Sequence, residues 1–250
     1  MHRFSNRTSR SAFSILGTAL AVILLMSHAL PALGQDATAT GSVVTTKTFW
    51  EMFKAGGVTL FILVALSIYT VTLLIERFTY YRSAAGNAEE LIEKIRQAPT
   101  LPEMHKAAEH APGIAGRVIR TTIQAARDGH QPDQIEDLAE SALTKELISM
   151  ERFLPQLDSM VTMCPLIGLL GTTIGMIKSF SVVAAIGMSD PSKLAGGISE
   201  ALINTAAGLA VAIPSLFAYN YFTGKKEAIL MDMEKSLTEL MVILKSSNQR

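Results

Sequence analysis

The sequence predicts an all-α integral membrane protein with three transmembrane helices, of which the second and third extend into a cytoplasmic helical bundle. Three observations support this class. The chain contains three long apolar segments, and apolar residues recur at helical spacing between and after them. Its 250 residues are also 49% hydrophobic and only 18% charged, which is an apolar composition for a soluble domain. Lys and Arg balance Asp and Glu at 22 each, so no basic face is indicated and we expect no nucleic-acid partner.

Residues 1–34 have the pattern of a signal peptide. Arg3, Arg7 and Arg10 precede an apolar stretch, and small residues at Ala32 and Gly34 favour cleavage before Gln35. An uncleaved anchor helix is the alternative, because this stretch is about long enough to span a membrane. In both cases residues 35–56 emerge on the periplasmic side.

Each of the three later apolar segments is long enough for a hydrocarbon core of about 30 Å. We place the first span at 57–76, the second at 159–186 and the third at 195–222, with a short loop at 187–194. Lys178 lies near the end of the second span, where its long side chain can reach the membrane surface. Glu200 lies near the start of the third.

The distribution of Lys and Arg predicts how these spans are oriented. Basic residues are frequent in 77–158 and in 223–250, whereas the segments 35–56 and 187–194 hold few. Because cytoplasmic segments are enriched in Lys and Arg, we expect 77–158 to form a cytoplasmic helical domain and 223–250 a cytoplasmic helical tail. This orientation agrees with an exported N-terminus.

Helix signals divide the cytoplasmic segment. A short helix should follow Asn87 and break near Pro99, a second should run from Pro112 to Asp128-Gly129, and a third should begin at Pro132. The third has no clear stop, which predicts one continuous helix from the cytoplasm into the second span. The tail should likewise continue the third span, because apolar residues recur along it at Ile229, Met233, Leu237, Leu240 and Leu244.

Small and polar residues gather on one face of the second span and one side of the third. At about 100° per residue, these residues are Gly168, Gly171, Thr172, Gly175 and Ser179 on the second span, and Glu200, Asn204, Thr205, Gly208, Ala212 and Ser215 on the third. One interpretation is close helix packing, with the hydroxyls bonded to their own backbone. The other is a hydrated interior, favoured by an ionisable group at the costly position of Glu200.

The sequence argues against covalent chemistry. The single cysteine, Cys164, excludes an internal disulfide and a cysteine-based zinc site. The five histidines lie in the signal region and the cytoplasmic segment, and none forms a His-Glu-x-x-His pattern. An intramembrane hydrolase is therefore disfavoured, and we expect no catalytic residue, metal or cofactor.

Two runs carry a family resemblance. The run Cys164-Pro-Leu-Ile-Gly-Leu-Leu-Gly-Thr-Thr-Ile-Gly-Met-Ile-Lys-Ser-Phe180 resembles the second transmembrane segment of the MotA/TolQ/ExbB proton-channel family. The run Gly197-Ile-Ser-Glu-Ala-Leu-Ile-Asn-Thr-Ala-Ala-Gly-Leu-Ala-Val-Ala-Ile-Pro214 resembles its third. Among members of the family, the chain looks most like ExbB. It departs from close relatives at Thr173-Ile174, where Val-Trp is frequent, and at Asn204, where Ala is common.

The resemblance implies a pentameric subunit of the Gram-negative inner membrane that surrounds the helices of ExbD, a single-span partner. With a TonB-like protein, it would use the proton-motive force to energise outer-membrane import of iron-siderophores, haem or vitamin B12-type substrates. The family's pore-lining threonines fall on Thr172 and Thr205 and its third-span glutamate on Glu200, to which we add Asn204. As residues that pack the helices against one another we expect Gly168, Gly171, Gly175, Gly208, Pro165 and Pro214. We expect membrane lipid to surround the outside of the spans.

No Asp or Glu lies at the centre of any span, and a threonine hydroxyl cannot bind and release protons. If protons cross here, a partner must supply the central carboxylate, and by resemblance this is an aspartate of ExbD. A TolQ-like subunit of the Tol-Pal system is the alternative role. A MotA-like stator fits less well, because that branch has four spans, and a purely structural scaffold remains open.

Overall fold

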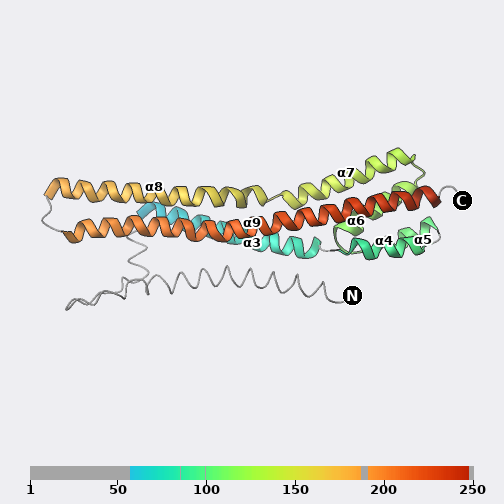
Figure 1. Cartoon of the computed structure of the whole chain (residues 1–250), viewed down its shortest axis with the longest axis horizontal. Helices are drawn as coiled ribbons and strands as arrows, with labels where there is room; N and C mark the ends of the chain where they lie inside the picture. The colour runs from blue at the N-terminus through green and yellow to red at the C-terminus, as the bar shows by residue number, and fades with distance from the viewer. Residues whose placement is uncertain (1–56, 85, 99, 187–190, 248–250) are drawn as a thin grey trace. The chain divides into compact units, whose positions relative to one another are not determined.

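The computed structural model describes residues 57–84, 86–98, 100–186 and 191–247. Within these ranges helices are joined by short connections and no strand is present, and three helices are long and apolar enough to cross a membrane (Figure 1). The prediction of an all-α protein with three such helices is confirmed. The predicted signal peptide (1–34), the segment 35–56 and residues 187–190 of the predicted loop lie outside the described residues.

The helices follow one another with short connections. They are α3 (Gly57–Ala84), α4 (Ala88–Gln97), α5 (Leu101–Glu109), α6 (Gly113–Arg127), α7 (Pro132–Glu151), α8 (Leu154–Ile186) and α9 (Pro191–Ser247). They form two compact units. The described parts of the first unit are residues 57–72, 156–186 and 191–218, and those of the second belong to 73–155 and 219–247.

The first unit holds the apolar parts of α3, α8 and α9. A small core joins all three helices and consists of Leu63, Met160, Cys164, Val211 and Ala212. Cys164 is a free, buried thiol within it. Many large side chains of these helices face outward, among them Leu166 and Leu202, as expected of surfaces that meet lipid.

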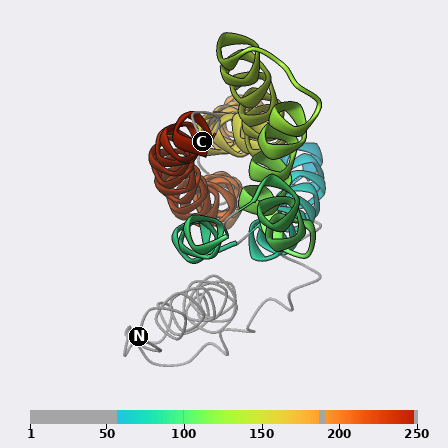
Figure 2. The same cartoon turned by 90° about the vertical axis from the view of Figure 1, so that its right-hand side faces the viewer.

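In the second unit α4, α5, α6 and α7 pack on one another (Figure 2). Their amphipathic faces bury aliphatic residues such as Ile95, Ile119 and Ile123. The predicted signals act as expected. The side chain of Asn87 caps α4 by accepting a hydrogen bond from the Glu90 amide at 3.3 Å, and Gly129 at φ +81° follows α6.

The sequence prediction missed α5, which starts after Thr100 with a proline in its first turn.

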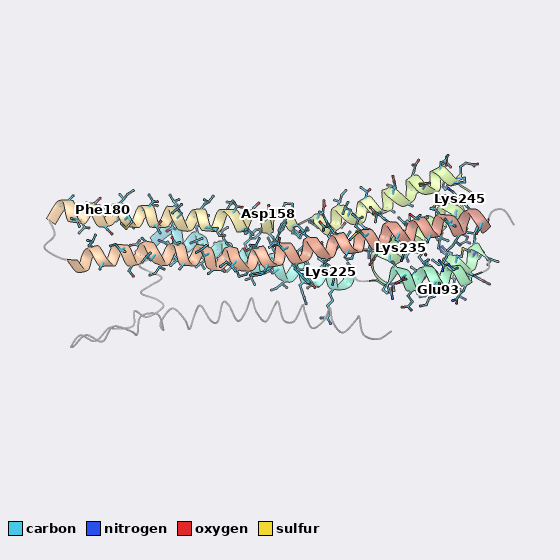
Figure 3. All side chains as sticks on the ribbon, in the orientation of Figure 1. Glu93, Asp158, Phe180, Lys225, Lys235 and Lys245 are labelled. Atoms are coloured by element: carbon cyan, nitrogen blue, oxygen red, sulfur yellow. The ribbon has the colours of Figure 1, made fainter. Side chains whose placement is uncertain are left out.

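The tail continues the third apolar segment, as predicted, because α9 extends without a break to Ser247. Within the second unit its apolar stripe is buried at Met233, Leu237, Leu240 and Leu244. Lys225, Lys235 and Lys245 follow one another along the same stretch, and Glu93 marks the exposed side of α4 (Figure 3). On the charged faces of this unit, Arg96 bonds to Glu239 at 3.1 Å.

A second charged contact joins two helices of the second unit. Arg117 of α6 makes two hydrogen bonds to Glu146 of α7, at 2.7 and 2.6 Å. These hydrogen bonds are the main reason why the pKa of the Arg117 guanidinium is raised.

One prediction about the helices is wrong. We expected a single helix from the cytoplasmic segment into the second span, but α7 ends at Glu151 and α8 begins at Leu154, with Arg152 and Phe153 in a turn. Pro155 provides the physical reason. It has no N–H to donate to the Glu151 carbonyl four residues earlier, and in a continuous helix its ring would clash with that carbonyl, so it fits the first turn of a new helix better than the middle of an old one.

Candidate functional site

The two small-residue faces predicted from the sequence lie against each other in the first unit. A Cβ added to Gly168 would lie 2.8 Å from the Asn204 carbonyl oxygen, and one added to Gly208 would lie 2.5 Å from the carbonyl oxygen of Cys164. A Cβ at Gly175 would contact Ala201 at 3.2 Å. The absent side chains therefore let the backbones of α8 and α9 approach closely, which is the role of small residues between membrane helices.

The outward faces of the same helices carry the large residues. On α9 these include Leu202, Leu209 and Ile213, whereas Asn204, Gly208, Ala212 and Ser215 are buried. The buried small and polar residues and the exposed large residues therefore lie on different sides of α9.

Asn204 occupies the centre of the contact. Its side chain is only 1% exposed and lies against Gly171, where a Cβ would come within 2.6 Å of the Asn204 Cβ and 2.9 Å of its amide nitrogen. Its Oδ1 atom is buried and has no hydrogen-bond partner in the described part of the chain. The prediction that Asn204 lines a proton path stays a prediction; in the single chain this amide fills the space that Gly171 leaves open.

Most hydroxyls of the stripe bond to their own helix. Thr172 donates to the Leu169 carbonyl at 2.6 Å, Ser179 to that of Gly175 at 3.0 Å, and Ser215 to that of Val211 at 2.7 Å. This is the arrangement that the packing interpretation expects. Thr172 and Thr205 are half-buried, so both also remain open to a neighbouring molecule.

Glu200 lies at one end of the stripe and has a charged partner. Its Oε1 atom is 3.3 Å from Nζ of Lys178, with Glu200 19% and Lys178 58% exposed. The amino end of α3 lies beside them, because a Cβ added to Gly57 would be 3.2 Å from the same Oε1 atom. A helix amino end favours a negative charge. Lys178 and the amino end of α3 therefore both place positive charge beside Glu200.

The prolines predicted as packing residues both lie inside helices, Pro165 in α8 and Pro214 in α9. A proline cannot donate to the carbonyl four residues earlier, so one backbone carbonyl in each helix lacks its usual helical partner. Pro165 follows Cys164, whose own carbonyl oxygen faces Gly208. The close contact and the interrupted hydrogen-bond pattern thus occur in the same turn of α8.

Two charged residues of the structure were not foreseen. Lys178 was interpreted only as a side chain that reaches the membrane surface, although a cation near the end of one span and an anion near the start of the next predict a pair. Arg77 was counted only as a basic residue after the first span, yet its side chain is 1% exposed. No sequence signal identified its distant partners, because they are backbone carbonyls about seventy residues further along the chain.

Within the described ranges no group of His, Cys, Asp and Glu side chains is arranged to hold a metal ion. Along the polar stripe of α8 and α9 the available groups are hydroxyls, the Asn204 amide and the Lys178–Glu200 ion pair. These groups can solvate or guide an ion, but no carboxylate stands midway along them.

The model of the MotA/TolQ/ExbB proton channel family matches residues 110–235, which include both faces of the α8–α9 contact. A biopolymer transport protein ExbB homolog of Methanothermobacter thermautotrophicus is 30% identical over 181 residues, covering 71% of this chain and 64% of that protein. The chain therefore spans slightly less than two thirds of this relative's length.

The chain is similar both to a protein named ExbB and to one named TolQ. The biopolymer transport protein ExbB of Xanthomonas campestris is 28% identical over 186 residues, which is 69% of this chain and 74% of the relative. The Tol-Pal system protein TolQ of Pseudomonas aeruginosa is 27% identical over 206 residues, which is 76% of this chain and 89% of the relative.

Proposed function

The chain belongs to the MotA/TolQ/ExbB proton channel family, and we propose that it is an ExbB-like subunit of a proton-driven motor in the inner membrane. With an ExbD-like partner it uses the proton-motive force to energise TonB-dependent transport across the outer membrane. The proposal includes a homo-oligomer, a periplasmic N-terminus after signal cleavage and a cytoplasmic C-terminus. The subunit conducts protons and transmits the energy of the proton-motive force to its partners, and it catalyses no covalent reaction.

One observation carries the proposal. The polar stripe of α8 and α9 begins at the Lys178–Glu200 pair and continues with Asn204 and Thr205, but it contains no carboxylate further along. Such a stripe can solvate a proton relay but cannot complete it, because a relay needs a group that changes its protonation state. A partner helix that brings an aspartate beside Thr172 and Thr205 would supply that group.

The test uses the tagged full chain, purified with the single-span protein that accompanies it and reconstituted into liposomes. We expect Thr205→Val and Glu200→Gln each to lower proton flux at least tenfold while the complex stays assembled. Thr173→Val is the matched control, because Thr173 is exposed and its hydroxyl donates to the Leu169 carbonyl of its own helix, at 3.0 Å. Wild-type flux in both stripe variants would show that these residues do not line the path, and a wild-type complex without flux would refute the channel proposal.

A TolQ-like role is the second candidate, because the Pseudomonas aeruginosa TolQ matches more of the chain than the Xanthomonas ExbB does. Expression of the chain in cells that lack either their own ExbB or their own TolQ separates the two roles. Restored siderophore-dependent growth supports the ExbB role, whereas restored resistance to detergents supports the TolQ role.

A further inference from the structure

Arg77 is a buried charge for which the channel proposal has no use. It belongs to α3 and to the second unit, where the chain has just left the first predicted span. A guanidinium is rarely buried unless its charge is neutralised and its N–H groups are bonded. Its partners therefore indicate what the surrounding structure requires of it.

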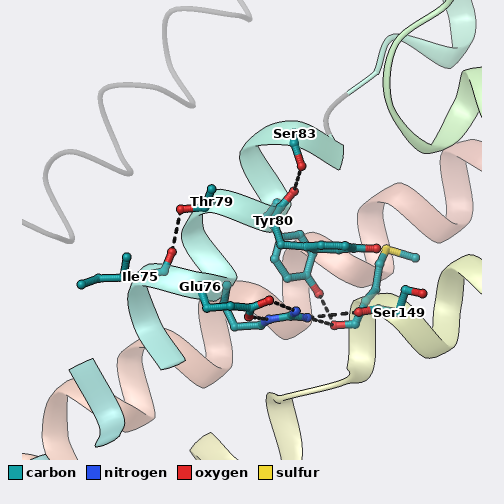
Figure 4. Close-up of polar contacts among 9 residues, drawn as sticks. Ile75, Glu76, Thr79, Tyr80, Ser83 and Ser149 are labelled. Atoms are coloured by element: carbon teal, nitrogen blue, oxygen red, sulfur yellow. Dashed lines mark hydrogen bonds and ion pairs between the residues drawn. The ribbon is translucent and has the colours of Figure 1, made fainter. Parts of the chain in front are cut away.

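The guanidinium is almost fully bonded (Figure 4). Nε and Nη2 donate to the two carboxylate oxygens of Glu76 at 2.5 and 2.7 Å, and Nη1 donates to the carbonyls of Ser149 and Met150, both at 3.1 Å. The rings of Tyr80 and Phe153 lie 4.7 and 5.0 Å from its central carbon. Only the planar fork of an arginine can make all these contacts, and a lysine ammonium cannot.

The two carbonyls belong to the last turn of α7, which ends at Glu151. Carbonyls at the end of a helix lack intrahelical donors, and the helix dipole gives this end a partial negative charge. A buried cation that donates to them stabilises the helix end directly. Tyr81 strengthens the same contact, because its hydroxyl donates to the Met150 carbonyl at 3.1 Å.

The contact between Arg77 and the end of α7 joins two distant points of the chain. Arg77 and Ser149 are 72 residues apart, and α4, α5, α6 and most of α7 lie between them. Arg77 therefore joins the point where this segment begins to the point where it ends. Helix α9 adds to the closure within the same unit, since Tyr81 stacks on Phe222 at 5.2 Å and Lys226 bonds to Glu151 at 2.9 Å.

We propose that Arg77 is a positioning residue that clamps the two ends of segment 78–149 together, so that the helices of this segment bear load as one body during energy transduction. The inference rests on the proposed motor function. A motor subunit delivers work only if the parts under load do not yield. With the clamp released, proton flow through the α8–α9 stripe continues while the work it should deliver is lost.

The experiment compares Arg77→Gln with Arg82→Gln, a matched control on the same helix whose side chain is exposed. Both are studied in the full complex by proton flux in liposomes, partner-dependent uptake in cells and amide hydrogen exchange. For Arg77→Gln we expect flux within twofold of wild type, uptake lowered at least tenfold, and exchange in the last turn of α7 at least tenfold faster. Arg77→Lys should restore part of the uptake, and Arg82→Gln should match wild type in all three.

Parallel loss of flux and uptake, or unchanged uptake with faster exchange, would overturn the clamp. If Arg77→Gln does not accumulate, Tyr81→Phe replaces it in the same three measurements. We expect changes in the same direction but smaller, because this variant loses one hydrogen bond to Met150 and keeps the ring on Phe222. A wild-type complex without flux would refute the channel proposal alone. Hydrogen exchange would still show whether Arg77 holds the end of α7.

Discussion

The two units of this chain are both helical, but they fill their helix contacts with opposite kinds of residue. In the first unit α8 and α9 meet through Gly168, Gly175 and Gly208, and large side chains point away. In the second unit α4–α7 meet through aliphatic side chains such as Ile119 and Ile123, which are fully buried.

The difference follows from the solvent that each unit is built for. In water the burial of apolar area drives helices together, so large side chains belong between them. In lipid this driving force is absent, and the association of helices is most favourable when their backbones approach closely and pack tightly. Substitutions that put one kind of contact where the other belongs should therefore destabilise both units, and the sizes of these losses can be ranked.

The largest effect should come from a bulky residue at the closest backbone contact. In Gly208→Leu the new side chain would start 2.5 Å from the Cys164 carbonyl oxygen and 3.3 Å from the Gly168 Cα atom, and both neighbours are backbone atoms that cannot rotate away. We expect almost no monodisperse protein after detergent extraction and size-exclusion chromatography.

Gly224→Leu is the matched control for this change. It lies on the same helix in the second unit, and an added Cβ there meets nothing within 4 Å. It should be recovered at the wild-type yield. Equal recovery of Gly208→Leu would mean that α8 and α9 do not pack through these glycines.

The second largest effect should come from a cavity in the aliphatic core. Ile119→Ala removes a fully buried side chain of α6 and should lower the free energy of unfolding by about 2–5 kcal/mol. In the first unit Leu202→Ala shortens an outward side chain of α9, and should cost less than about 0.5 kcal/mol. SDS-induced unfolding of the full chain in mixed micelles, followed by circular dichroism, measures both. A large loss for Leu202→Ala would show that its face is covered by protein rather than lipid.

This contrast also explains how far the sequence could predict the structure. Apolar length predicted the three long helices, and helix signals predicted α4, α6 and α7, because both depend on residues close in the chain. The contact face of α9 was predictable since Asn204, Gly208 and Ser215 differ visibly from Leu202 and Leu209. The helix α5 was missed because it is short, and the prolines around it read as a break.

Long-range contacts of single side chains were not predictable. Arg77 donates to the carbonyls of Ser149 and Met150, and every residue has a carbonyl, so no pattern marks these partners. The break before Leu154 was missed although Pro155 is a signal for it, because the apolar spacing continues on both sides. The orphaned Oδ1 atom of Asn204 also depends on the register of α8 against α9, which one sequence does not fix.

The smallest and most specific effect concerns Gly171 and Asn204. In Gly171→Ala the new methyl would lie 2.6 Å from the Asn204 Cβ and 2.7 Å from its Cγ, an overpacking that typically costs about 1–3 kcal/mol, partly offset by the better helix propensity of Ala. In Asn204→Ala the loss of contacts is partly offset too, because the buried oxygen without a partner disappears.

In the double variant the overpacking is partly relieved, because the Asn204 Cγ and Nδ2 atoms that lie 2.7 and 2.9 Å from the new methyl are gone, whereas the Cβ at 2.6 Å stays. We therefore expect the double variant to be more stable than the sum of the single effects by at least about 0.5 kcal/mol, as for residues in direct contact. The same unfolding assay measures all three variants. Ile119→Ala paired with Asn204→Ala is the control cycle, since Ile119 belongs to the other unit and should give a simple sum. Additive effects at 171 and 204 would show that the amide does not occupy the space beside Gly171, and would return Asn204 to the list of side chains free to face the proton path.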